Sequence, residues 1–196
     1  MKHYLKTLFE PASIALFGAS EREGSVGTVV LHNLLADKFK GRILPVNPAH
    51  DQVQGQRCYR SLDDVDDKVD LAVVAAPARV VPEIIEQCGQ AGIRNAVILS
   101  AGFREVGTQG RKLEAQVLSS ARRYGLRFVG PNCLGIMRPE IGFNATFNKG
   151  GAHAGKLALV SQLGALCTAI LDWAYGQEIG FSSVISMGIS ADIGFG

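Results

Sequence analysis

The stretch Ser13-Ile14-Ala15-Leu16-Phe17-Gly18-Ala19-Ser20 decides the fold of this chain. Ile14–Phe17 is a continuous apolar run, and Gly18 ends it. A strand without polar alternation is typical of a parallel sheet that is covered on both faces. The same succession of apolar run, small turn residues and helical period recurs further along the chain, so this stretch opens a strand–helix series.

The series predicts a doubly wound, Rossmann-like parallel sheet of α/β class. We expect its strands at Ser13–Phe17, Ile43–Val46, Leu71–Ala75, Ala96–Leu99 and Arg127–Val129. Helices are expected over Gly27–Ala36, roughly Val80–Ala91 and roughly Gln109–Tyr124.

The alternation is interrupted between Pro139 and Lys156, where Asn148-Lys149-Gly150-Gly151 is typical of a linker. A new strand is expected at Leu157–Val160, then a helix over Gly164–Tyr175 with Leu166, Ile170 and Leu171 inward, and a strand at Ser183–Met187. We therefore predict a first domain at residues 1–147, a linker at 148–156 and an incomplete second α/β domain at 157–196. An incomplete domain implies a fragment of a longer protein.

Composition excludes several classes of protein. Of 196 residues, 47% are hydrophobic, and 20 Lys+Arg against 18 Asp+Glu leave a formal charge of +2. This balance argues against a nucleic-acid-binding or polybasic membrane module. The longest apolar stretch, Leu71–Ala78, is too short to cross a bilayer, and Lys2, His3 and Lys6 precede no signal-peptide core. The four cysteines form no CxxC pair, so we expect no metal and a reducing cytoplasm: Cys58, Cys88, Cys133 and Cys167.

Five aspartates lie between Ser61 and Asp70. The segment lacks the glycine and terminal glutamate of a calcium loop. A solvated helical turn with Leu62, Val65 and Val69 inward is the favoured interpretation, with calcium as the alternative.

Ligands of open parallel sheets bind at the carboxyl ends of the strands. The five expected strand ends are built mainly from small, proline or hydrogen-bonding residues, namely Gly18-Ala19-Ser20, Asn47-Pro48-Ala49-His50, Ala76-Pro77-Ala78, Ser100-Ala101-Gly102 and Gly130-Pro131-Asn132-Cys133. Such residues let backbone N–H groups approach a ligand closely. The first end leads through a glycine loop into a helix N-terminus, which suits phosphate. The pattern predicts a ligand crevice.

The first loop is not a dinucleotide fingerprint, because Gly18, Gly24 and Gly27 are too widely spaced for GxGxxG. Asn47 and Pro48 stand where an acidic residue would hold the adenosine ribose. Nicotinamide dinucleotides are therefore disfavoured. The remaining candidate ligand is a nucleotide with phosphates and a long uncharged tail.

Three motifs carry a family resemblance that spans essentially the whole chain. Leu8–Ser20 resembles the opening of the NDP-forming acyl-CoA synthetases, Gly130-Pro131-Asn132-Cys133-Leu134-Gly135 their GPNCxG turn, and Ser161-Gln162-Leu163-Gly164 their SxSG turn. The resemblance implies a Rossmann-like CoA-binding domain, as in the succinyl-CoA synthetase α subunit, then a flavodoxin-like domain with a phosphorylated histidine and an ATP-grasp domain. The phosphohistidine is expected beyond residue 196, since His153 lies in the expected linker, His3 near the terminus and His32 on a helix.

The resemblance also implies site residues. CoA phosphates and ribose would be held by Gly18, Ala19, Ser20, Gly24, Ser25 and Gly27, and the second strand end adds Asn47, Pro48 and His50. His50 stands where the succinyl enzymes have a lysine. Adenine and pantetheine would be lined by Ala76, Pro77, Ala78, Ser100 and Ala101, with Asn132 and Cys133 near the thiol end. A phosphate-binding helix start would comprise Ser161 as N-cap, Gln162 and Gly164.

Ala169–Ala174 and Gly180–Ser182 resemble Pat-type protein lysine acetyltransferases, which fuse a synthetase-like region to a GNAT domain. Leu163 in place of the second serine of SxSG favours that branch. We therefore expect a chain that binds CoA or acetyl-CoA, from a GNAT-fused acetyltransferase or an ADP-forming synthetase. The alternative is a non-enzymatic nucleotide-sensing module.

We assign no catalytic residue, because no histidine or carboxylate accompanies Cys133 in sequence, and we expect the chain alone to be inactive. ATP, ADP and Mg would act only through domains outside this chain. The expected partner is a downstream ATP-grasp domain, a GNAT domain or both. The acyl group and any homo-oligomer are left open.

Overall fold

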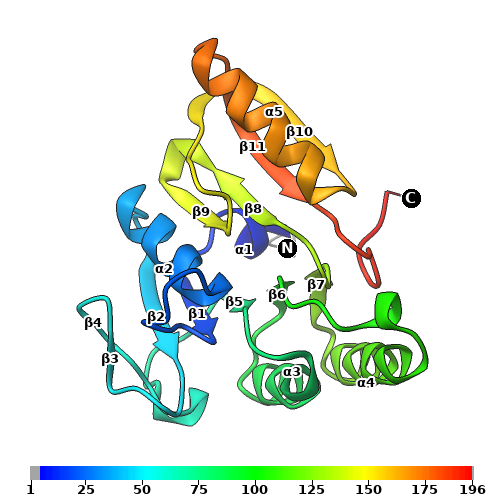
Figure 1. The fold of residues 1–196 in the computed structure, drawn as a ribbon. Helices are drawn as coiled ribbons and strands as arrows, with labels where there is room; N and C mark the ends of the chain where they lie inside the picture. Colours follow the sequence, from blue (N-terminus) through cyan, green and yellow to red (C-terminus); the bar gives the residue numbers. More distant parts are fainter. Residues whose placement is uncertain (1–4, 196) are drawn as a thin grey trace.

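The computed structural model describes residues 5–195 and contains two main sheets (Figure 1). The first is a five-stranded parallel sheet in the order β2-β1-β5-β6-β7. Its strands are β1 (Ser13–Phe17), β2 (Arg42–Val46), β5 (Leu71–Val74), β6 (Asn95–Ile98) and β7 (Arg127–Val129). This confirms the predicted class, and each predicted strand of this sheet agrees with the structure to within one residue.

Helices cover both faces of the first sheet. They are α1 (Leu5–Phe9), α2 (Val26–Ala36), α3 (Val81–Gln90) and α4 (Thr108–Tyr124). Leu31 of α2 packs with Leu16 in one core, whereas Ile85 of α3 and Val117 of α4 pack with Phe17 in the core on the other face. The chain therefore changes face between β1 and β5, and the edge of the sheet next to Gly18 is the topological switch point.

The second sheet has the order β10-β11-β8-β9. Its strands are β8 (Gly135–Arg138), β9 (Phe143–Thr146), β10 (His153–Ser161) and β11 (Gly180–Ser186), and α5 (Gly164–Gly176) packs against β10 and β11. The hairpin of β8 and β9 was not predicted, because two four-residue strands around Pro139 and Gly142 carry no clear period. β8 pairs with β11, so part of residues 1–147 joins the second sheet. The proposed division of the chain into domains stays a prediction.

Three expectations for the second sheet are wrong. β10 begins at His153 and not at the expected Leu157, and the His153 ring stacks on Tyr175 with centroids 4.5 Å apart. Leu166 is 48% exposed rather than inward, whereas Leu171 is buried. The N-cap of α5 is Leu163, because the Ser161 hydroxyl accepts from the Leu163 N–H (3.1 Å) in the turn before the helix.

Two smaller elements lie between β2 and β5. β3 (Gln52–Val53) and β4 (Gln56–Arg57) form a short antiparallel hairpin. The aspartate-rich segment forms a 3-10 turn at Leu62–Asp64 that Ser61 and Asp64 cap reciprocally. Leu62 and Val69 are buried and Val65 packs against the same core, as the helical interpretation predicted.

Among residues 5–195, no helix is both long and apolar enough to cross a bilayer.

Candidate functional site

The ends of neighbouring strands are tied to one another by short hydrogen bonds. The Asn47 amide after β2 donates to the Ala19 carbonyl (2.7 Å) after β1. The Ser100 hydroxyl after β6 donates to the Ala76 carbonyl (2.6 Å) after β5. The Asn132 N–H after β7 donates to the Ser100 carbonyl (2.9 Å). Because the side chains of Asn47 and Ser100 and the backbone of Asn132 hold neighbouring loops together, the carboxyl edge of the sheet is pre-organised.

The loop between β1 and α2, together with the start of α2, is the part of this edge that could bind a phosphate. Gly18 has φ +84°, and a Cβ at Gly27 would overlap the Gly18 carbonyl oxygen, so α2 begins directly on the end of β1. Ser25 is the N-cap, and its hydroxyl accepts from the Thr28 N–H (3.3 Å). The first N–H groups of a helix have no partner within it, so those of Val26 and Gly27 are placed to meet an anion.

The hairpin of β3 and β4 supports this loop, and sequence analysis missed that contact. The Gln54 N–H donates to a Glu21 carboxylate oxygen (2.5 Å), and the Gln54 amide donates to the Thr28 carbonyl (2.9 Å). These two bonds hold the glycine loop from its outer side. No local pattern marks the hairpin, because each of its strands has only two residues.

Three cavities follow one another along the carboxyl edge. Cavity A, of about 470 Å³, is lined by Phe17, Gly18, Val46, Asn47, Pro48, Arg60, Ser61, Ala76, Pro77, Arg79, Val80, Glu83, Ile84 and Gln87. Cavity B, also about 470 Å³, is lined by Gly18, Ser20, Arg22, Ser25, Val26, Gly27, Asn47, Ala75, Ala76, Pro77, Leu99, Ser100, Ala101, Asn132 and Phe147. Cavity C, of about 670 Å³, is lined by Arg104, Asn132, Cys133, Leu134, Phe147, Gln162, Leu163, Gly164, Ala165, Thr168, Gly188 and Ile189. Cavities A and B share four lining residues and cavities B and C share Asn132 and Phe147, so the three lie next to one another. We call this row of neighbouring cavities the crevice.

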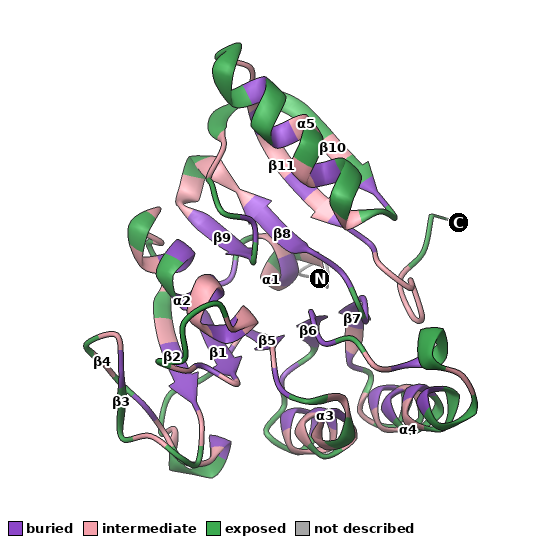
Figure 2. Ribbon diagram, in the orientation of Figure 1, coloured by how far each residue is buried: buried purple, intermediate pink, exposed green. Residues whose placement is uncertain are grey.

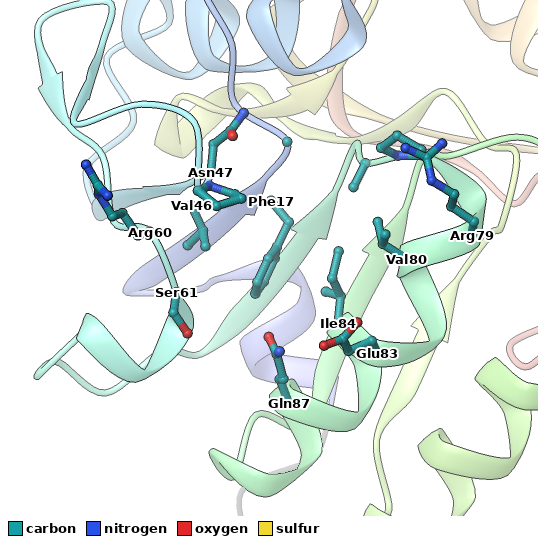
Figure 3. A pocket seen from close by; sticks show the side chains of 14 residues that line it. Phe17, Val46, Asn47, Arg60, Ser61, Arg79, Val80, Glu83, Ile84 and Gln87 are labelled. Carbon is teal, nitrogen blue, oxygen red and sulfur yellow. The ribbon is translucent and has the colours of Figure 1, made fainter.

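Cavity A is a slot between the ends of β1 and β2 and the side of α3 (Figure 3). Figure 3 shows Phe17 between the strand ends and Ile84 of α3, with Gln87 below. Arg60 and Arg79 lie on opposite sides of the slot. A side-chain hydrogen bond to Asp51 (3.1 Å) raises the pKa of Arg60. The slot therefore combines apolar walls with two cationic side chains at its rim.

The structure brings most of the predicted site residues to this crevice. Lining it are Gly18, Ser20, Ser25, Gly27, Asn47, Pro48, Ala76, Pro77, Ser100, Ala101, Asn132, Cys133, Gln162 and Gly164. The remaining predicted residues are outside the lining of these cavities: Ala19, Gly24, His50, Ala78 and Ser161. His50 is half-buried in the turn after β2.

Several lining residues were missed by sequence analysis. They are Arg60, Arg79, Glu83, Gln87, Arg104 and Phe147. The helical period after Pro77 placed Glu83 and Gln87 on one side of a helix, but nothing in the sequence showed that this side faces β2. Phe147 follows the unpredicted strand β9.

Cys133 is a packed turn thiol. Its sulfur lies 3.4 Å from the Ile98 carbonyl oxygen. Burial raises the pKa of this thiol to about 12, so it stays protonated at neutral pH. That Cys133 has no nucleophilic role stays a prediction.

Comparison with known proteins agrees with this geometry. Residues 12–139 match the CoA binding domain family, and residues 154–196 match the succinyl-CoA ligase like flavodoxin domain. An ADP-forming acetate–CoA ligase of Methanocaldococcus jannaschii is 47% identical over 189 residues, 96% of this chain and 26% of that protein. An ADP-forming 4-hydroxybutyrate–CoA ligase of Nitrosopumilus maritimus is 42% identical over 186 residues, 94% of this chain and 26% of that protein.

A solved structure is similar over nearly the whole chain. The dinucleotide-forming acetyl-coenzyme A synthetase 1 of Ca. Korarchaeum cryptofilum, in complex with phosphate and ADP, superposes with a TM-score of 0.92 at 40% identity. The match covers 97% of this chain and 41% of that one. The chain therefore spans about a quarter to two fifths of the length of these relatives.

The fold and the crevice define an α/β protein with a CoA-binding domain of the Rossmann-like type. The chain belongs to the NDP-forming acyl-CoA synthetase superfamily, of which it is a CoA-binding region.

Proposed function

We propose that cavities A, B and C together bind CoA or an acyl-CoA, and that the whole protein is an ADP-forming acyl-CoA synthetase. The observation that carries this proposal is the adjacency of the three cavities along the switch-point edge. An apolar slot, a helix N-terminus and a passage between small residues match an adenine, its phosphates and an uncharged arm in that order.

The residues divide naturally among the parts of such a ligand. In cavity A, Phe17, Val46, Val80 and Ile84 would enclose the adenine. In cavity B, the phosphates would be held by Ser20, Arg22 and Ser25 with the N–H groups of Val26 and Gly27, and the uncharged arm would be flanked by Ala76, Pro77, Ser100 and Ala101. The thiol end would reach Asn132, Cys133 and Phe147, beside cavity C. The proposed roles of Ala19, Gly24, His50 and Ala78 would then be to shape the loops around the ligand.

The activity of the whole protein is a choice between two branches. Relatives named as ADP-forming ligases support the synthetase, with ATP, ADP and Mg bound by an ATP-grasp domain or subunit. Leu163 at the SxSG turn favours the second candidate, a lysine acetyltransferase fused to a GNAT domain. ADP release that requires acetate and CoA would support the first, and acetyl transfer to a lysine peptide the second. A cytoplasmic location suits either branch, since all four cysteines are free and buried.

Calorimetry on the 196-residue chain tests the binding proposal. We expect CoA to bind and NADH not to bind, because no carboxylate replaces Asn47 at the end of β2. Arg22→Gln, in cavity B, should weaken CoA about tenfold through the loss of a charge-assisted hydrogen bond to phosphate. Arg111→Gln, at an exposed position of α4 outside all three cavities, is the matched control. Tighter binding of NADH than of CoA would instead identify a nucleotide-sensing module.

A further inference from the structure

Phe147 occupies the junction of two cavities. Together with Asn132 it lines both cavity B and cavity C. Its side chain is 38% exposed, although the neighbouring Thr146 and Asn148 are buried. Covering an exposed aromatic ring removes apolar surface from water and is favourable. The Phe147 ring therefore offers an apolar contact surface to a ligand that extends from cavity B into cavity C.

The backbone on both sides of Phe147 is fixed by one buried side chain. The Asn33 amide, on α2, donates to the Thr146 carbonyl (2.8 Å) and to the Asn148 carbonyl (2.8 Å). The Phe147 N–H itself donates to the Leu134 carbonyl (3.3 Å). Hydrogen bonds in a buried environment are electrostatically strong and hold the groups they join. Helix α2, whose first turn borders cavity B, thus also sets the position of the ring.

We propose that Phe147 is the wall on which the thiol end and first acyl carbons of an acyl-CoA pack, and that Asn33 is its positioning residue. The proposal rests on CoA binding in the crevice. An acyl thioester carries no charge, so a fixed apolar surface complements it. Cavity C continues this surface with Leu134, Leu163 and Ile189. The ring therefore contributes to affinity for the acyl end and not to affinity for the nucleotide end.

Two probe ligands separate these ends. Adenosine 3′,5′-bisphosphate represents the nucleotide, and butyryl-CoA adds the arm and a four-carbon acyl group. Phe147→Ala should weaken butyryl-CoA about tenfold, comparable to the effect of a changed contact in an apolar pocket, and leave the bisphosphate unchanged. Trp173→Ala removes a more exposed aromatic ring (62% exposed) on α5, outside all three cavities, and should change neither affinity.

The role of Asn33 is tested by a double-mutant cycle. Asn33→Ala should weaken butyryl-CoA selectively, and the double variant with Phe147→Ala should show no further loss, because both changes remove the same contact. Thermal unfolding confirms that each variant is folded. Equal weakening of both ligands by Phe147→Ala, or no weakening, would overturn the inference. Failure of the unaltered chain to bind either ligand would instead overturn the proposed CoA binding.

Discussion

Cys133 is a buried thiol at the carboxyl edge of the first sheet. It lies beside Asn132 at the edge of the crevice, yet its side chain is buried and its sulfur faces the Ile98 carbonyl. Burial raises the pKa of the thiol from 9.0 to about 12, and backbone hydrogen bonds oppose this shift only in part. Burial likewise raises the pKa of Cys88 to about 12. Burial disfavours the charged thiolates, so ionisation of Cys88 and Cys133 destabilises the folded state.

The pH dependence of stability follows from the sign of this shift. The contribution of Cys133 is fully present below pH 9 and is lost as the pH rises towards 12, because the unfolded chain releases the proton first. Urea titrations at several values between pH 8 and pH 11 should show that Cys133→Ala loses less stability with pH than the unaltered chain. Lysines and tyrosines titrate in both proteins and cancel in this comparison. Identical pH dependence of the two proteins would contradict the buried, neutral thiol.

At the scale of elements, the contact between α2 and β1 decides whether the crevice exists. A Cβ at Gly27 would overlap the Gly18 carbonyl oxygen, so only glycine lets the helix begin against the strand end. Ser25, Thr28 and the Gln54 contact then hold the loop in that place. The same helix carries Asn33 towards Thr146 and Asn148. One helix therefore connects the loop between β1 and α2 with the junction of cavities B and C.

We expect Gly27→Ala to lower the free energy of unfolding by about 1–3 kcal/mol, since an added methyl group in a packed contact forces the backbone apart. The same shift moves the first turn of α2, so CoA affinity should fall too. Gly176→Ala, at the end of α5, is the control, because nothing lies within 4 Å of the added Cβ. Urea denaturation and calorimetry measure the two effects. A Gly27→Ala protein as stable as the Gly176→Ala protein would show that α2 does not need this close approach.

For the molecule as a whole, one hydrophobic cluster contains residues of both sheets. Ile136, Phe143 and Met187 pack in the same cluster as Leu16 and Leu31 of the first sheet. Asn144 of β9 also donates to the Asp37 carboxylate (2.9 Å) at the end of α2. In contrast, α5 turns much of its surface outward (Figure 2), including Leu166 and Trp173. The crevice spans both sheets because cavity C is lined by the segment after β7, by α5 and by the segment after β11.

A cluster shared by both sheets predicts a single cooperative unfolding transition. Trp173, the sole tryptophan of the sequence, reports on α5, whereas far-UV circular dichroism reports on all elements. The urea midpoints of the two signals should coincide, as they do for two-state proteins. An earlier transition of the Trp173 fluorescence would show that the second sheet unfolds separately, in accord with the predicted division at residues 148–156.

The sequence by itself determined the first sheet and the place of the crevice. Continuous apolar runs, such as Ile14–Phe17 and Leu71–Val74, are typical of strands buried on both faces, and parallel strands bring their carboxyl ends to one edge. Local residue types at Gly18, Asn47 and Asn132 were therefore enough to predict a ligand site there.

Only the tertiary structure decided which side chains complete that site. β8 pairs with β11, which lies about fifty residues further along the chain, and no local period encodes a pairing over such a separation. Arg79, in the turn before α3, and Gln87, on α3, reach cavity A because this segment lies opposite the ends of β1 and β2. Phe147 reaches the cavity junction because a side chain of α2 fixes its backbone. These placements depend on contacts between distant elements, and such contacts form only when the whole core is assembled.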